Sequence, residues 1–206
     1  METSRQTDNN FRTRVPLAHK SDQGFALLES LIALVILMVG LLGLMGLQTH
    51  TTLAQTEAYQ RQQALLLTQD IVDRINANHV TAGCYVVANA TGGEYLGTGT
   101  NTPITCDGYG DATTQPQAVD DLHEWQAQLL GAGEQHASSS VGGMIGARGC
   151  ITLKDPVDQI YTVEVAWQGV RASAAPASTC AAGLYGDETK RRAISIDVRV
   201  ANLTAP

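Results

Sequence analysis

The sequence predicts an α+β protein in which one long N-terminal helix, from about residue 25 to about residue 78, packs on a small antiparallel β-sheet with disulfide-pinned loops. Three observations support this fold class. An uninterrupted apolar run covers residues 25–47, helical spacing continues to about residue 79 without proline or glycine, and alternating apolar residues mark strands near the C-terminus.

The apolar run is long enough to cross a membrane. Its 23 residues, Phe25 to Leu47, contain a single charge, Glu29. As a helix they would span about 35 Å, and a bilayer core is about 30 Å thick. Basic residues before the run predict a cytoplasmic N-terminus by the positive-inside rule. We therefore expect residues 25–47 to cross a membrane and the chain after them to lie outside the cytoplasm.

The second part of the helix, residues 48–79, is amphipathic and is expected to lie outside the membrane and to cover a sheet. Apolar residues recur at helical spacing, among them Ile71 and Ile75. Glu57–Arg61 and Asp70–Arg74 are predicted to form ion pairs four residues apart.

Residues 80–206 are expected to form a C-terminal α+β domain. Residues 81–117, rich in Gly, Thr, Asn and Pro, are predicted to be a long loop. A second helix is predicted to begin at a capping box formed by Asp121 and Glu124, with Trp125 as an anchor in the core.

Three strands are predicted near the C-terminus, at about residues 146–154, 161–167 and 194–200. In the middle strand, Tyr161, Val163, Val165 and Trp167 share one face. The short turn between the first two strands implies antiparallel pairing, with one face of the sheet on the long helix and the other exposed to solvent.

The four cysteines, all after the apolar run, indicate disulfides in an oxidising compartment. Without a Cys-x-x-Cys pair, zinc binding is disfavoured. Three pairings are open in principle. The sequence favours Cys84–Cys106, which bracket one loop, and Cys150–Cys180, which connect the first sheet strand to the loop before the last one.

The composition and motifs argue against catalysis. The net charge of −7 disfavours nucleic acid as a partner. The glycine-rich residues 92–99 lack the lysine of a phosphate-binding loop, and residues 107–111 fall short of an EF-hand. No nucleophile motif and no paired catalytic carboxylates are evident. We expect no enzymatic activity, no metal and no cofactor.

Gly24-Phe25-x-x-x-Glu29, followed by about twenty apolar residues, resembles the class III signal of type IV pilins and pseudopilins. The resemblance implies that residues 1–24 are a leader, that a prepilin peptidase cuts between Gly24 and Phe25, and that Phe25 becomes N-methylated. It also implies that Glu29 pairs with the N-terminal amine of a neighbouring subunit.

Four further segments resemble PilV-type minor pilins. These are residues 41–48, residues 120–129 with Asp120, Trp125 and Leu129, residues 149–151 and residues 161–169. This resemblance implies the type IV pilin fold and a minor pilin that helps to initiate pilus assembly, at the tip with other minor pilins, the major pilin and an adhesin. The protein would wait in the inner membrane and then enter the pilus.

Two alternatives remain open at the sequence level. A minor pseudopilin of a type II secretion system would carry the same N-terminal signal, although the four cysteines and the chain length favour the pilus. A signal-anchored envelope protein with a ligand-binding domain would need neither Gly24 nor Glu29.

Overall fold

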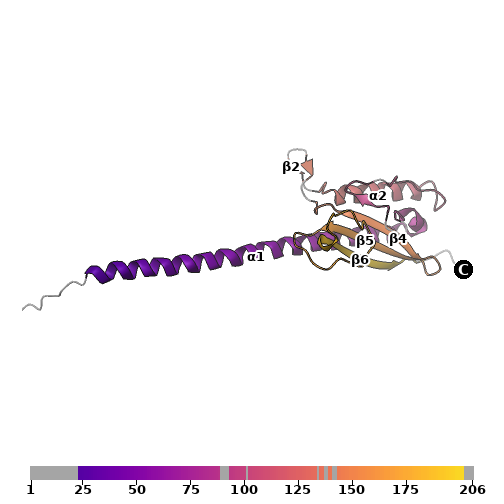
Figure 1. Ribbon diagram of the computed structural model, residues 1–206. Helices are drawn as coiled ribbons and strands as arrows, with labels where there is room; N and C mark the ends of the chain where they lie inside the picture. Colours follow the sequence, from indigo (N-terminus) through magenta and orange to yellow (C-terminus); the bar gives the residue numbers. More distant parts are fainter. Residues whose placement is uncertain are drawn as a thin grey trace, which may run out of the picture. The chain divides into compact units, whose positions relative to one another are not determined.

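The computed structural model describes residues 23–88, 93–100, 102–133, 135–136, 139–140 and 143–201. Residues 1–49 and residues 50–206 form two compact units, here called the N-terminal segment and the head. Helix α1 (Gln23–Ala77) contributes to both (Figure 1). The long helix predicted for residues 25–78 is confirmed. Most of the predicted leader lies outside the described residues.

Within the head, α1 buries one stripe of its surface. Ala64, Thr68, Ile71 and Ile75 are fully buried, at intervals of three or four residues that place them on one side of a helix. The hydroxyl of Thr68 donates to the carbonyl of Ala64 at 2.7 Å, so this polar side chain is satisfied inside the core. The stripe packs on the sheet, as the amphipathic pattern predicted.

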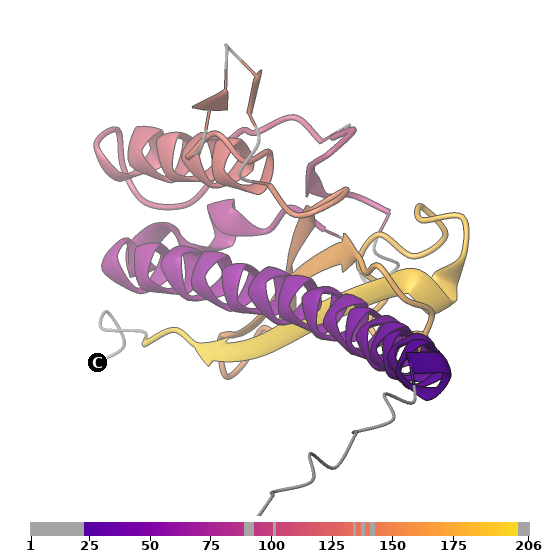
Figure 2. The same cartoon turned by 90° about the vertical axis from the view of Figure 1, so that its left-hand side faces the viewer.

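The main sheet has four antiparallel strands in the order β1-β4-β5-β6. The strands are β1 (Leu96–Gly97), β4 (Arg148–Asp155), β5 (Ile160–Gln168) and β6 (Arg191–Arg199). Figure 2 shows β6, in yellow, as an outer strand of the sheet. β2 (Gln135–His136) and β3 (Ser139–Ser140) pair in a separate small ribbon. The three predicted strands are confirmed, and β1 is an addition.

The face of β5 that was predicted to be apolar forms the core under α1. Tyr161, Val163, Val165 and Trp167 are all buried in one cluster with the helix stripe. The prediction of a solvent-exposed opposite face was wrong at one end of the sheet, although Ser195 and Asp197 of β6 are exposed on that face. Cys150 and Ala166 are buried there, beneath a second cluster formed by loop residues. The members of this second cluster are Ala88, Tyr95, Cys150, Ala166, Cys180, Ala181 and Tyr185.

Helix α2 (Thr114–Leu129) begins seven residues before the predicted capping box. The carboxylate of Asp111 accepts hydrogen bonds from the backbone N–H groups of Thr113 and Thr114, at 2.8 and 2.9 Å, and so closes the start of the helix. These bonds also hold the pKa of Asp111 below its ordinary value. Asp121 therefore lies inside the helix, and the capping-box prediction was wrong.

The predicted loops also contain short helical turns. η1 (His79–Tyr85) continues directly after α1, and η2 (Glu188–Lys190) precedes β6. Together with β1 and the first part of α2, η1 gives regular structure to a minor part of the long loop expected over residues 81–117. η1 was not predicted from the sequence because its residues include Thr81 and Gly83, which have weak helix propensity.

Trp125 is the anchor of α2, as predicted. Its side chain is fully buried, and its indole N–H donates to the carbonyl of Leu67 on α1 at 3.0 Å. The ring lies against Gly149 of β4, where a Cβ atom would stand 2.3 Å from it. Only glycine at this position lets the indole approach the strand so closely.

Candidate functional site

The N-terminal segment is a helix without a buried face. Every large apolar side chain from Phe25 to Leu47 exposes at least half of its surface, all around the helix. A helix that is apolar on all sides needs an apolar environment outside the chain. This is the one helix among the described residues that is long and apolar enough to cross a membrane. The segment is therefore suited to membrane anchoring, and also to packing among other apolar helices.

Two polar side chains interrupt the segment near its start. Ser30 directs its hydroxyl back to the carbonyl of Ala26 at 2.5 Å, which satisfies it within the helix. Glu29 is exposed, and its carboxylate has no partner among the described residues. Phe25 and Glu29 are four residues apart and thus lie on the same side of α1. Glu29 is therefore the one charge that an apolar environment would leave unsatisfied.

In the head, Arg74 joins the two helices. Its guanidinium contacts Asp70 on α1 at 2.9 Å, and Asp121 and Glu124 on α2 at 3.0 and 2.8 Å. The predicted Asp70–Arg74 pair is confirmed, but the contacts to α2 were not foreseen. The hydrogen bond to Glu124, above all, raises the pKa of Arg74, so the group is permanently charged. The two carboxylates assigned to a capping box thus hold α2 against α1.

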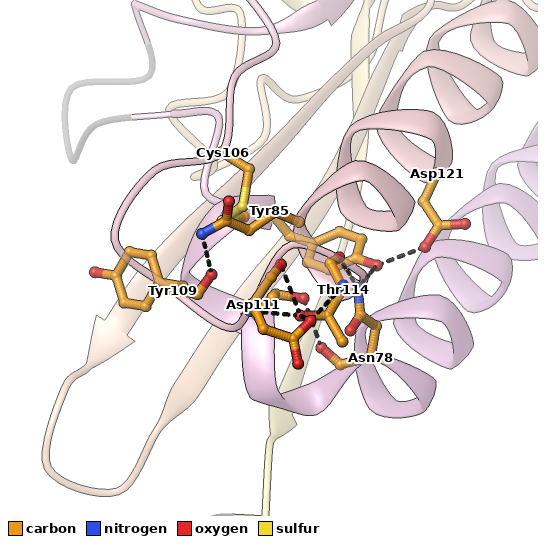
Figure 3. Close-up of a disulfide and its surroundings, with 10 residues drawn as sticks. Asn78, Tyr85, Cys106, Tyr109, Asp111, Thr114 and Asp121 are labelled. Atoms are coloured by element: carbon orange, nitrogen blue, oxygen red, sulfur yellow. Dashed lines mark hydrogen bonds between the residues drawn. A yellow bond between two sulfur atoms is a disulfide. The ribbon is translucent and has the colours of Figure 1, made fainter.

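A second polar contact lies beside Arg74 and the first disulfide. The hydroxyl of Tyr85 donates to Asp121 at 2.5 Å, and Asn78 donates to the carbonyl of Thr114 at 2.9 Å (Figure 3). Burial, strengthened by the bond to Asp121, raises the pKa of Tyr85, which keeps its proton available for donation. The end of α1 is in this way connected to α2 through buried, satisfied polar groups.

The structure contains two disulfides, Cys84–Cys106 and Cys150–Cys180, the pairs that the sequence favoured. The first joins η1 to the segment that leads to α2. The second joins β4 to the loop before η2 and is buried in the second cluster. The first disulfide therefore holds a loop against η1, and the second holds a loop on the sheet.

Removal of either disulfide is expected to lower the stability of the head. For the double variant Cys150→Ser/Cys180→Ser we expect a loss of about 2–4 kcal/mol in the free energy of unfolding, because the unfolded chain gains freedom. Tryptophan fluorescence during urea unfolding of the full chain in detergent measures it, since both tryptophans, Trp125 and Trp167, lie in the head. Non-reducing peptide mapping checks the pairing, and a Cys84–Cys150 link would contradict it.

Loss of Arg74 is expected to destabilise the contact between α1 and α2. In Arg74→Met, the side chain of Asp121, only 13% exposed, loses its cation, and we expect a cost of about 2–3 kcal/mol. The control Glu124→Gln removes a carboxylate that is 61% exposed and should cost less than about 1 kcal/mol. The same fluorescence measurement applies. Equal losses for the two variants would show that Arg74 is not the centre of the contact.

The predicted Glu57–Arg61 pair was wrong. Glu57 instead accepts a hydrogen bond from the backbone N–H of Arg171 at 3.0 Å and lies 3.5 Å from the guanidinium of Arg192. Arg171 follows β5, and Arg192 belongs to β6. Both partners are far from Glu57 in the sequence, so a prediction based on neighbours along one helix could not identify them. Arg61 is left without an acidic partner among the described residues.

The described residues form no metal centre. They contain no group of three or more His, Cys, Asp or Glu side chains that could hold an ion. Asp111, one of the acids in the glycine-rich segment 107–111, is used to close the start of α2. The features of the head that stand out are thus structural contacts and exposed surfaces.

Comparison with known proteins identifies the N-terminal signal. Residues 19–45 match the family model of the prokaryotic N-terminal methylation motif. No curated protein and no solved structure shows significant similarity to the chain. The motif, the long apolar helix and the small antiparallel sheet with two disulfides together support a type IV pilin-like or pseudopilin-like protein. Proteins of this kind are generally structural rather than enzymatic.

Proposed function

We propose that the chain is a minor pilin of PilV type that enters a type IV pilus and helps to initiate its assembly. The observation that carries the proposal is the methylation motif at residues 19–45, located on a helix whose apolar residues are exposed on all sides. A signal for processing and an apolar surface for packing thus occur in one segment.

The maturation steps follow from the motif. Residues 1–24 act as a leader, and a prepilin peptidase cuts between Gly24 and Phe25. The same class of enzyme then methylates the amine of Phe25. Lys20 provides a positive charge just before the cut. After processing, the mature N-terminus is an amine located one helical turn before Glu29.

The mature protein is divided as the sequence suggests. Residues 25–47 anchor it in the inner membrane, residues 48–79 continue the helix in the periplasm, and residues 80–206 form the C-terminal domain there. A periplasmic location agrees with two disulfides, which form in oxidising compartments. During assembly the apolar helix leaves lipid for the core of the filament, where Glu29 meets the amine of a neighbouring subunit.

The proposed partners are the prepilin peptidase, other minor pilins, the major pilin and a tip adhesin. Two disulfides, a chain of 206 residues and long loops favour a pilus subunit over a small secretion pseudopilin. The proposal includes no cofactor, metal or nucleic-acid partner.

Deletion of the gene in its own host tests the function. We expect few or no surface pili, as counted by electron microscopy, and unchanged type II secretion. When the gene is returned to the deletion strain, pili should reappear, and the sheared filament fraction should contain small amounts of the protein. Normal piliation with lost secretion would instead identify a pseudopilin. Normal piliation and secretion in the deletion strain, together with wild-type protein that retains residues 1–24, would identify a signal-anchored envelope protein.

A further inference from the structure

Strand β6 leaves one long edge of the sheet unpaired. It is the last strand in the order β1-β4-β5-β6 and covers nine residues. The hydrogen bonds from Gly169 to Lys190 and from Val200 to Gln159 fix the pairing pattern between β5 and β6. In that pattern the backbone groups of residues 192, 194, 196 and 198 face β5.

The backbone groups of the alternate residues must therefore point away from the sheet. These are the N–H and C=O groups of Ala193, Ser195 and Asp197, and no described residue provides a partner for them. Ser195 and Asp197 are exposed, so the edge is open to another chain. An unpaired row of this kind is a template for an additional strand.

A groove runs beside this edge. It has a volume of about 360 Å³ and lies between Glu57, Ala58 and Arg61 of α1 and the residues Arg192, Ala193 and Ile194 of β6. Because Ala193 belongs both to the groove and to the open edge, a strand added to β6 would direct some of its side chains into the groove.

The groove is basic, although the chain carries a net charge of −7. Among the described residues that line it, Glu57 is the only acid, and it already contacts Arg192 and the backbone of Arg171. Arg61 has no acidic partner there. A bound polypeptide with a carboxylate side chain would pair with Arg61 and balance the positive charge of this surface.

The charged side chains near the end of β6 would not hinder the addition of a strand beside the groove. Asp197 contacts Lys154 at 2.5 Å, and Arg199 contacts Asp158 at 2.7 Å. Asp197 and Arg199 alternate with Ile194 and Val198, which pack against the core under α1. They therefore lie on the opposite face of the sheet from the groove.

We propose that the free edge of β6 binds an extended segment of another polypeptide, which pairs with residues 193–197 and places an acidic side chain beside Arg61. This is strand addition, in which backbone bonds provide affinity and the side-chain groove provides selectivity. This docking surface is separate from the apolar helix of the proposed assembly role. It is tested on the isolated chain, so its failure and that of the proposed function are separate outcomes.

The test uses a fluorescent peptide, Thr-Val-Thr-Val-Glu-Val-Thr-Val, and the full chain in a mild detergent. We expect saturable binding by fluorescence anisotropy, and about fivefold weaker binding of the same peptide with Lys in place of Glu. Arg61→Ala should weaken binding of the Glu peptide about fivefold. Arg199→Ala, a matched change on the opposite face, should leave it unchanged. No saturable binding by the wild-type chain would overturn the proposal.

A proline at the edge tests the backbone contribution. Ser195→Pro removes an N–H group that points outward and leaves the bonds to β5 intact, so binding should be lost. Ser195→Ala keeps the N–H group and should bind as the wild type does. If the proline variant does not fold by tryptophan fluorescence, a probe with alternate N-methylated amides replaces it and should not bind. Binding that survives the loss of these backbone donors would contradict strand addition.

Discussion

Gly24→Val is expected to abolish removal of the leader, so that nearly all of the protein keeps residues 1–24. A peptidase subsite that accepts glycine at the position before the cut has no room for a branched side chain, while the membrane segment itself is unchanged. Intact-mass analysis of membrane-extracted protein measures the result. The wild type should begin at a methylated Phe25, and the variant should retain Met1 and an unmethylated Phe25.

The change at Gly24 should also prevent assembly, for an electrostatic reason. The retained leader carries Arg5, Arg12, Arg14 and Lys20 and several acids. These charges cannot enter a core of apolar helices without a large desolvation cost. Gly24→Ala, which adds one methyl group, is the control and should still be cut in part. Full processing of Gly24→Val would refute the proposed cleavage position.

The main elements of the fold could be predicted because their patterns are local. The stripe of Ala64, Ile71 and Ile75 has helical spacing, and the alternation from Tyr161 to Trp167 has strand spacing. The buried residues of both elements are the ones that these periods select. The N-terminal signal was equally accessible, because its residues are consecutive and the family match depends on the same segment.

The errors arose where distant residues determine the structure. Asp121 and Glu124 have the spacing of a capping box, but Arg74 on another helix binds both. Asp111 was the better signal for the start of α2, since Thr114 follows at three residues and Pro116 fits the first turn. With the start of α2 predicted at Asp111, Asp121 and Glu124 would have been recognised as available for a contact between helices.

The second buried face of the sheet illustrates the same limit. Ala166 lies at a position that the alternation assigns to solvent, but the loop held by Cys150–Cys180 covers it. Single-strand periodicity shows which residues share a face, while burial of that face depends on loops elsewhere in the chain. A disulfide between a strand and a distant loop is the sequence feature that indicates such a cover.

Glu29→Ala is expected to leave cleavage largely intact and to lower incorporation into filaments by about a hundredfold. Under the proposed function, cleavage depends mainly on Gly24, whereas assembly places residue 29 among apolar helices. In the variant, the amine of a neighbouring subunit loses its partner there. A charge buried without its partner costs about 3 kcal/mol or more, which corresponds to this factor. The ratio of the protein in sheared filaments to the processed protein in the membrane measures the effect.

The neighbouring hydroxyl provides the matched control. Ser30→Ala removes a side chain of the same helical turn whose only described bond is made inside the helix, to the carbonyl of Ala26. No intermolecular partner is lost, so incorporation should match the wild type. Equal incorporation of Glu29→Ala and wild type would remove the carboxylate from the assembly mechanism. A parallel loss in Ser30→Ala would show that the turn itself, rather than the charge of Glu29, is what the filament requires.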